Sequence, residues 1–480
     1  MPAMTLYDEI PYASYPHAPS HPDQLATVAH LHGLDPPAPS TARVLELGCG
    51  SGANTIGIAY GMPNASVVGI DNSTTAIEAA RRAADEMSLE NLELRVADVR
   101  ELAHGGLGQF DYIIAHGLYS WVDAPTRAAL VGACASALGP HGLVFLSFNT
   151  HPGGHFRRGL RDLAFWYAGG AAGTREQARR ARALFSGLSK LRGSDDPYGA
   201  LLASELPELA AADDDHLVHD LLSADWRPAW FSEFDADLRD HELQYVGEAS
   251  FHRFTGPWDD EAEAALWELA GDDRTAYHQL MDFMVWRRFR DSVACRAGRE
   301  VGHHADPARV AGLSARPAGP LEPDGRQDPI LASLAAAAPD PVPCAELATT
   351  FGGDVGAVAV RLLDLARRGR VTLHFDPPAV GAAGVEHPRV SRLARAQAVA
   401  GTGFCTTRYG GIVKLDGEVI RSLIVLTDGT RSRDAIRTEL AAAGAPLLAP
   451  DQLDQALRDL AAMGLLEPAA EPVDRQGGGA

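Results

Sequence analysis

The chain has 480 residues, of which 46% are hydrophobic and 22% charged, and its formal net charge is -21. Such a composition is typical of a globular protein, and the length suffices for about three domains of ~150 residues each. The charge disfavours nucleic acid as a partner, because an acidic surface repels phosphates. No stretch approaches the ~18 unbroken apolar residues of a membrane span.

The N-terminal stretch and the cysteines indicate a cytoplasmic protein. The first residues, MPAMTLYDEIPYASYPHAPSHPD, lack the basic start and the apolar core of a secretion signal. The five cysteines lie far apart without a CxxC pair. This spacing fits reduced thiols and predicts neither a disulfide framework nor a metal site.

The order of hydrophobic and amphipathic segments predicts an α/β protein. Residues 1–40 are rich in Pro and Tyr and are expected to form a lid segment. Over residues 41–170, hydrophobic runs alternate with helical stretches, which predicts a doubly wound sheet of parallel strands wrapped by helices. The expected strands are 43–48, 66–71, 92–98, 110–117 and 142–149.

The second half of the chain predicts helices and small mixed units. Residues 171–315 read as mostly helical, and 316–328 as a linker rich in Pro, Gly and charge. Residues 329–470 hold two runs of short helices that end at glycine before a short strand, which indicates winged-helix-like units. Because this region is not basic, we expect it to dock a protein or form a homodimer rather than bind DNA. The tail, 471–480, is expected to be disordered.

A glycine loop follows the first expected strand in VLELGCGSG, residues 44–52. Glycine lets the backbone turn tightly and lets a ligand press on main-chain atoms. Dinucleotide binders use the spacing G-x-G-x-x-G, so that a helix N-terminus can hold pyrophosphate. Here the spacing is G-x-G-x-G, and Glu46 stands just before it. An acid at this position suits a ligand that carries an ammonium and a sulfonium group.

Two further acids close the next two strands. Asp71 ends the second strand, where a carboxylate can accept both hydroxyls of a ribose. Asp98 ends the third strand, where a carboxylate can accept from an adenine amino group. Three acids at successive strand ends are stronger evidence for a bound nucleoside than the glycines alone. The alternative is a nicotinamide-dinucleotide enzyme or a purely structural sheet, and both the glycine spacing and the acid positions disagree with it.

This pattern resembles the class I S-adenosylmethionine-dependent methyltransferases. The resemblance implies a Rossmann-like sheet, S-adenosylmethionine as the methyl donor and S-adenosylhomocysteine as the product. It implies that Ala115 to Gly117 lie beside the reacting centre. The cofactor-binding residues that it implies are Glu46, Gly48, Cys49, Gly50, Gly52, Asp71, Asn72, Asp98, Val99, Ala115 and His116.

The acceptor side carries aromatic residues. The fourth strand is followed by AHGLYSW instead of the Asn/Asp-Pro-Pro-Tyr/Phe motif of many enzymes that methylate planar amino groups, which disfavours amides and nucleobases. Aromatic faces attract a cationic amine, and an apolar pocket favours its neutral, nucleophilic form. Each ring can equally belong to the core. The expected substrate contacts are Tyr7, Tyr12, Tyr15, Tyr119, Trp121 and Phe148, with Tyr119, Trp121, His116 and Asn149 in the acceptor pocket.

The role of His116 stays open at this point. An imidazole can act as a general base near neutral pH. His116 can equally be a buried strand-end histidine with satisfied hydrogen bonds, and a neutral amine needs no protein base.

A narrower resemblance rests on YDEIPY (7–12), FDYIIAHGLYSWV (110–122) and SFNTHPGGH (147–155). These motifs are similar to those of bacterial protein-lysine methyltransferases with a helical methyltransferase regulatory domain and a C-terminal winged-helix module. The resemblance covers about residues 5–300 and implies N-methylation of lysine in a protein or peptide. It departs at His155, where an aromatic such as Trp is expected. The alternatives are an N- or O-methyltransferase of small molecules or peptide natural products, and a cofactor-sensing regulator without turnover.

Overall fold

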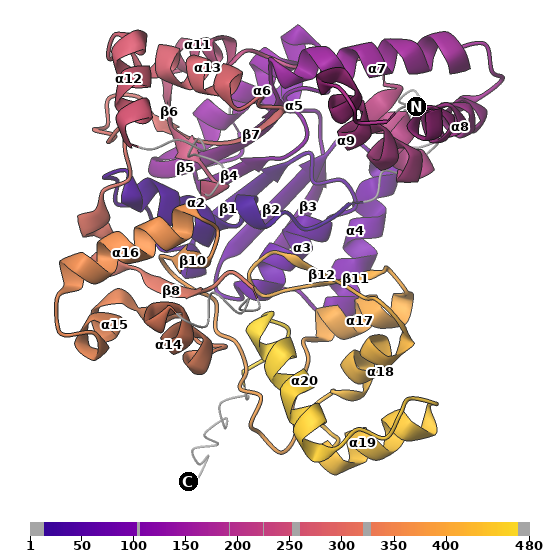
Figure 1. Ribbon diagram of the computed structural model, residues 1–480, viewed down its shortest axis with the longest axis vertical. Coiled ribbons are helices and arrows are strands. Elements are labelled where there is room, and N and C mark those ends of the chain that lie inside the picture. The colour runs from indigo at the N-terminus through magenta and orange to yellow at the C-terminus, as the bar shows by residue number, and fades with distance from the viewer. Residues whose placement is uncertain are drawn as a thin grey trace.

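The computed structural model describes residues 14–102, 106–191, 193–223, 225–251, 260–319 and 328–468. A central sheet is flanked by helices, and the C-terminal part, drawn in orange and yellow, lies below it (Figure 1). Tyr7 and Tyr12, most of the expected linker and the tail fall outside the described residues. Nothing in the described parts of the chain forms a helix with both the length and the hydrophobicity needed to cross a membrane.

The central sheet has seven strands in the order β3-β2-β1-β4-β5-β7-β6. Strands β1 to β5 pair in parallel, whereas β7 runs antiparallel to both β5 and β6. The chain order reverses beside β1, which creates the crevice where ligands bind in open α/β sheets. The α/β class and the five expected parallel strands are confirmed. The strands are β1 Arg43–Leu47, β2 Ser66–Asp71, β3 Leu92–Val96, β4 Phe110–Ala115, β5 Leu138–Asn149, β6 Leu243–Glu248 and β7 Phe289–Arg296.

Two strands of this sheet come from the stretch that the sequence predicted as mostly helical. Strands β6 and β7 are mostly buried, although they carry polar residues such as Glu248 and Asp291, and they form an antiparallel pair beyond β5. The chain between β5 and β6 is therefore an insertion into the sheet. Thr150, just after β5, bridges to Ala229, so the insertion leaves and returns at the carboxyl end of β5.

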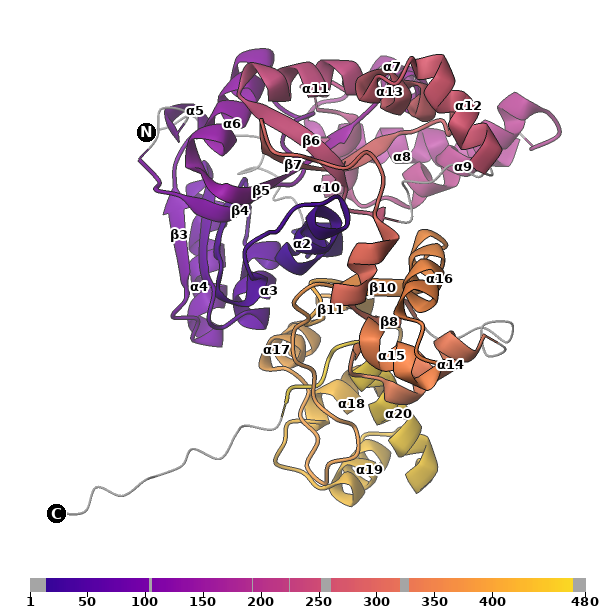
Figure 2. The ribbon, with the colours of Figure 1, turned by 90° about the vertical axis from the view of Figure 1, so that its left-hand side faces the viewer.

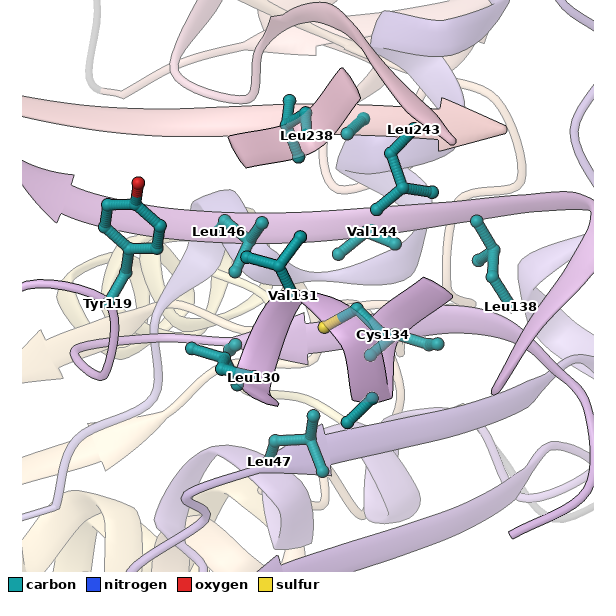
Figure 3. Packing of buried hydrophobic residues seen from close by; sticks show 14 of the residues in the cluster. Leu47, Tyr119, Leu130, Val131, Cys134, Leu138, Val144, Leu146, Leu238 and Leu243 are labelled. Carbon is teal, nitrogen blue, oxygen red and sulfur yellow. The ribbon is translucent and has the colours of Figure 1, made fainter. Parts of the chain in front are cut away.

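Helices cover both faces of the sheet because alternate strand residues point to opposite sides. On β1, Val44 packs with α2 and α3, whereas Leu45 packs with α6 and α11. Figure 3 shows Val131 and Cys134 of α6 beside β5. Each of the five cysteines is a buried free thiol. The helices of this part are η1 Ala18–Ser20, α2 Pro22–Leu31, η2 Pro39–Thr41, α3 Ala53–Gly61, α4 Thr74–Met87, α5 Val99–Leu102 and α6 Ala124–Ala137.

The insertion is helical, as expected, and has its own hydrophobic core. Phe185 of α8 and Leu160 of α7 lie in this separate cluster, while α11 packs on the sheet. Strand β7 follows the last helix. The helices between β5 and β6 are α7 Gly153–Ala168, α8 Thr174–Leu191, α9 Pro197–Ala211, α10 Asp214–His216, a π-helical turn η3 Leu217–Leu221 and α11 Phe231–Asp240, and those between β6 and β7 are α12 Asp260–Ala270 and α13 Arg274–Met284.

The C-terminal part begins with a three-stranded antiparallel sheet in the order β10-β8-β9. Helix α16, which precedes the strand β10, stops before Gly369, whose φ is 65°. The sequence pattern predicts this order of a helix, a glycine and a short strand. The winged-helix assignment itself stays a prediction. The elements are η5 Pro307–Gly312, β8 Ser314–Pro317, α14 Pro329–Ala337, β9 Val342–Pro343, α15 Cys344–Thr350, α16 Val355–Arg367 and β10 Val371–His374.

The last part of the chain packs four helices around a two-stranded hairpin and has its own core. Leu423, Leu440 and Leu457 from three different helices lie fully buried in that core. The elements are α17 Arg392–Ala400, β11 Phe404–Thr406, β12 Ile412–Lys414, α18 Glu418–Leu426, α19 Arg433–Ala442 and α20 Pro450–Ala462.

Candidate functional site

The glycine loop lies between β1 and α3, at the point where the strand order reverses. Gly48, Gly50 and Gly52 all have positive φ, at 74°, 54° and 82°. A Cβ on Gly48 would lie 2.7 Å from the Leu118 side chain, and one on Gly52 would lie 2.9 Å from the Cβ of Ala80. Both the backbone conformation and the space therefore require glycine. The loop offers bare main chain to a ligand, with Cys49 buried between its glycines.

Glu46 lies on β1, two residues before the glycine loop, and its side chain is held in place by α3. Its side chain is buried and accepts hydrogen bonds from Asn54 Nδ2 at 3.0 Å and from the Thr55 hydroxyl. Burial raises the pKa of Glu46 to about 7, although both hydrogen bonds act in the opposite direction. Each carboxyl oxygen keeps a further lone pair. The helix α3 thus orients an acid that can still accept from a ligand ammonium.

Asp71 ties the glycine loop to the end of β2. Its Oδ2 accepts the Gly50 N–H at 2.9 Å, and its Oδ1 accepts the Ser73 N–H at 2.8 Å. Asn72 beside it is exposed. The structure therefore brings the loop and the second acid together, as the sequence predicted for a cofactor cradle.

Asp98, the third acid, is held by a neighbour. It accepts the Arg100 backbone N–H at 2.9 Å and Nε at 3.0 Å, and forms an ion pair with the same guanidinium. These hydrogen bonds hold the pKa of Asp98 below its usual value. Val99 beside it packs against the sheet core. An adenine contact at Asp98 would have to share the carboxylate with Arg100.

His116 follows Ala115, the last residue of β4, and is held on two sides. Its Nδ1 lies 2.9 Å from the Ser147 hydroxyl, and its ring stacks on His17 with centroids 3.8 Å apart. Burial, and then the nearby His17, lower the pKa of His116 to about 3. The ring is therefore neutral at physiological pH.

His17 connects His116 to a carboxylate that sequence reasoning missed. Its Nε2 lies 3.1 Å from Oδ1 of Asp291 on β7, and Ser250 donates to the other oxygen at 2.7 Å. Burial opposes ionisation of Asp291, but the hydrogen bonds from His17 and Ser250 outweigh it and hold its pKa below the usual value. No local motif marks Asp291, because only the sheet brings β7 to this place.

Tyr119 and Phe148 lie in the core, which corrects the expectation that they surround an open mouth. Tyr119 is fully buried, and its hydroxyl donates to Asp237 of α11 (its ring is labelled in Figure 3). Phe148 stacks on Phe234 of the same helix with centroids 4.4 Å apart. The physical reason is that α11 packs over both rings.

The other expected acceptor residues lie at contacts with later segments. Trp121 is half-buried in the loop after β4. Asn149, at the end of β5, accepts the Trp226 indole N–H at 3.0 Å. Tyr15 is 46% exposed, and its ring centroid lies 5.2 Å from that of Phe404. The insertion and the C-terminal part therefore shape the surroundings of these residues.

An aromatic cluster that the sequence did not predict follows Asn149. His151 and His155 stack with centroids 3.9 Å apart, and Trp230 lies 4.8 Å and 5.5 Å from them. Phe283, which is 55% exposed, stacks on Trp230 at 5.3 Å. The position where an aromatic such as Trp was expected is thus His155, with Trp230, the N-cap of α11, beside it. Among the described residues, His151 Nδ1 is buried without a hydrogen-bond partner.

Two family models match the chain. The model described as a methyltransferase domain matches residues 44–142, and the one described as a predicted methyltransferase regulatory domain matches residues 213–296. The first match contains β1 to β4 and the glycine loop. The second contains α11, β6 and β7, so the regulatory domain supplies the last two strands of the sheet.

Curated proteins are similar to part of this chain. One uncharacterized protein of Rickettsia prowazekii is 33% identical over 291 residues, which is 60% of this chain and 52% of that protein. Another from the same organism is 28% identical over 48% of this chain and 91% of its own length. A Synechocystis protein is 25% identical over 52% of this chain and 50% of its own. The chain thus spans about half the length of two of these relatives.

The fold is also similar to that of a solved structure. PKMT2 from Rickettsia typhi in complex with AdoHcy matches with a TM-score of 0.81 and 23% identity, over 95% of this chain and 100% of that chain. A second structure of PKMT2 from Rickettsia typhi matches with a TM-score of 0.79. At this identity the likeness concerns the fold. The two family models identify a methyltransferase domain that is followed by a predicted methyltransferase regulatory domain, and the fold of this chain is that of PKMT2.

Proposed function

We propose that the protein transfers the methyl group of S-adenosylmethionine to lysine amines of a protein or peptide. The observation that carries this proposal is the contact of Asp71 with the Gly50 N–H beside buried Glu46. It joins an acid for a ribose to a bare glycine loop at the switch point of the sheet. A ligand with hydroxyls and an ammonium fits this donor and acceptor set.

The residues that would hold the cofactor follow from this arrangement. Glu46 would accept from the ammonium of the methionine part, and the loop from Gly48 to Gly52 would lie against it without a Cβ in the way. Asp71 would accept from the ribose. The bound cofactor supplies an electrophilic methyl carbon on a sulfonium. The chain's task is then to position a neutral amine in line with that carbon, which accounts for much of the rate in such reactions.

Charge and aromatic surfaces support an amine as the acceptor. Burial, and then the carboxylates of Asp215 and Asp213, raise the pKa of Tyr15. Ser14, its neighbour, approaches Gly50. These acids and the net charge of -21 would attract a lysine-bearing partner.

The cluster of Trp230, His151 and His155 offers faces to the amine near the end of β5. PKMT2, whose name denotes a protein-lysine methyltransferase, is similar in fold over 95% of this chain. The aromatic cluster supports an amine as the acceptor, and the likeness to PKMT2 supports a protein as the molecule that carries it.

We propose no general-base role for His116. Its pKa of about 3 lies far below the ~10.4 of a lysine ammonium, so it would not hold the proton that the amine must lose. The stacking on His17 gives the ring a fixed orientation instead. The amine would then lose its proton to water before the transfer.

The test is incubation of the full chain with a bacterial cell extract and with S-adenosylmethionine that carries a labelled methyl group. Mass spectrometry of tryptic peptides should find the label on lysine. Label in small solutes would support a small-molecule methyltransferase instead. Calorimetric binding of the cofactor without label transfer to any fraction would support a cofactor-sensing regulator. The variant Asp71→Ala should abolish transfer, and the exposed Asp85→Ala on α4 should not.

A further inference from the structure

A cavity of about 950 Å³ lies between α2 and the C-terminal part of the chain. Figure 2 shows α2 near β10, with α14, α15 and α17 to α20 below them. The walls come from α2, the turn after β6, strands β8 and β10, the β11–β12 hairpin and α20. None of the glycine-loop residues lines it. Its size is that of pockets that enclose small organic ligands, about 300–1,000 Å³.

Most of the wall is apolar. Val28 and Leu31 of α2 face it from one side, and Val371, Leu373 and Met463 from the C-terminal part. Such a lining favours a ligand with an apolar body, because burial of its surface removes it from water.

One wall carries a cation without an anionic partner. Arg316 of β8 lies with its guanidinium carbon 4.0 Å from the centroid of the Tyr409 ring, and donates from Nη1 to the Ala462 carbonyl at 3.0 Å. Its Nε is buried without a hydrogen-bond partner. Within the described parts of the chain, no carboxylate forms an ion pair with it. Arg316 as a whole is half-buried, and its buried Nε can still donate a hydrogen bond to an anionic ligand.

A neutral donor lines the same cavity. His21 is 4% exposed, and its Nδ1 accepts the Asp23 backbone N–H at 3.3 Å, so the proton of the neutral ring is on Nε2. Burial lowers the pKa of His21 to about 4, which keeps the ring neutral. Among the described residues, Nε2 is buried and has no acceptor. Arg316 and His21 therefore both lack an acceptor at the wall of one cavity.

The acids of this wall are already satisfied. Asp23 lies 2.7 Å from His374 Nδ1 and accepts the backbone N–H groups of Phe375 and Asp376. Asp459 accepts from the Gln455 amide at 2.8 Å. One unpaired cation facing two carboxylates suits a monoanion better than a dianion, because each acid repels further negative charge.

We propose that this cavity binds a small organic carboxylate with an apolar body. Its carboxylate accepts hydrogen bonds from Arg316 and His21, and its body lies along the apolar wall of α2 and β10. The site is independent of the proposed methyl transfer. Because its walls come from three segments of the chain, an occupant would hold α2 and the C-terminal part together.

The test uses octanoate and 1-octanol, which have the same chain length and differ in charge. Calorimetry with the full chain should give octanoate an affinity at least about ten-fold higher, as expected for charged hydrogen bonds. Octyl phosphate, a dianion, should bind more weakly than octanoate. Equal affinity for octanoate and octanol, or tighter binding of the phosphate, would overturn the proposal.

Variants locate the site. Arg316→Gln should weaken octanoate binding about ten-fold or more, while Arg316→Lys should weaken it less. Ala335→Phe, on the cavity wall in α14, should block it. The matched control is Arg43→Gln, which removes an exposed arginine over Phe110 away from the cavity. Circular dichroism melts check folding. Unchanged octanoate affinity in folded Arg316→Gln and Ala335→Phe would contradict the assignment.

Discussion

The cofactor side and the acceptor side of the strand edge are assembled in different ways. On the cofactor side, hydrogen bonds join residues 9 and 21 positions apart, from Glu46 to Thr55 and from Gly50 to Asp71. On the acceptor side, the contact of Asn149 with Trp226 spans 77 positions, and that of Tyr119 with Asp237 spans 118. The first side is a local motif. The second exists only when the insertion has folded over the sheet.

This difference teaches why a methyltransferase domain is easier to identify than its acceptor. A ligand common to many enzymes can be held by one strand-turn-helix unit and the next strand end. An acceptor is held by whatever segments the chain places over the remaining strand ends. The following changes test the two sides separately.

The largest effect is expected on the cofactor side. Asp71→Ala removes the acceptor of two backbone N–H groups and the proposed ribose contact, so cofactor affinity should fall roughly 100-fold. Calorimetry measures it, with Asp85→Ala as the control. An unchanged affinity in the folded variant would refute the cofactor site.

On the acceptor side, Trp230→Ala should lower kcat/KM for a lysine peptide about ten-fold, because it removes the ring that stacks beside His151 and His155. Cofactor affinity should stay the same. Trp166→Ala, which removes a 78% exposed indole from α7, is the matched control. Equal losses in both variants would argue against an acceptor role for Trp230.

The pH dependence of cofactor binding sharpens the role of Glu46. With a folded pKa of about 7, Glu46 binds its proton more tightly than in the unfolded chain, where the pKa is ~4.3. Folding stability therefore decreases as pH rises from 4.5 to 7, the reverse of an ordinary paired acid. Cofactor affinity should increase roughly five- to ten-fold between pH 6 and 7.5 as the carboxylate forms. Titration calorimetry measures this slope.

The matched variant is Glu46→Gln, in which this pH slope should disappear and the affinity at pH 7.5 should fall. If cofactor affinity still depends on pH in Glu46→Gln, another group is responsible for the titration.

The smallest effect is expected at the third strand. Arg100→Ala frees Asp98 from a solvent-exposed ion pair, which contributes little because water and salt screen it. If Asp98 contacts the adenine, cofactor affinity should rise by up to about five-fold. A lower affinity would mean that the ion pair itself orders the site.

The sequence was sufficient for the parallel strands and the glycine turn. Its hydrophobic runs predicted β1 to β5, and the spacing of Gly48 to Gly52 predicted the turn that the structure contains. It was insufficient for β6 and β7, which are short, mix apolar with charged residues and lie among helices. The sequence also did not settle whether Tyr119 and Phe148 belong to the core or to a pocket. In the structure both rings pack against Phe234 of α11 and therefore lie in the core.

By itself, the sequence determined what depends on neighbouring residues. Only glycine tolerates the positive φ values of the loop, and alternation of apolar residues marks a buried strand in any context. The tertiary structure alone decided which distant groups meet: His17 with Asp291, Trp230 with His155, and α2 with the C-terminal elements around a shared cavity. The reason is that burial and hydrogen-bond partners arise from the packing of whole segments, and no local preference encodes where those segments will lie.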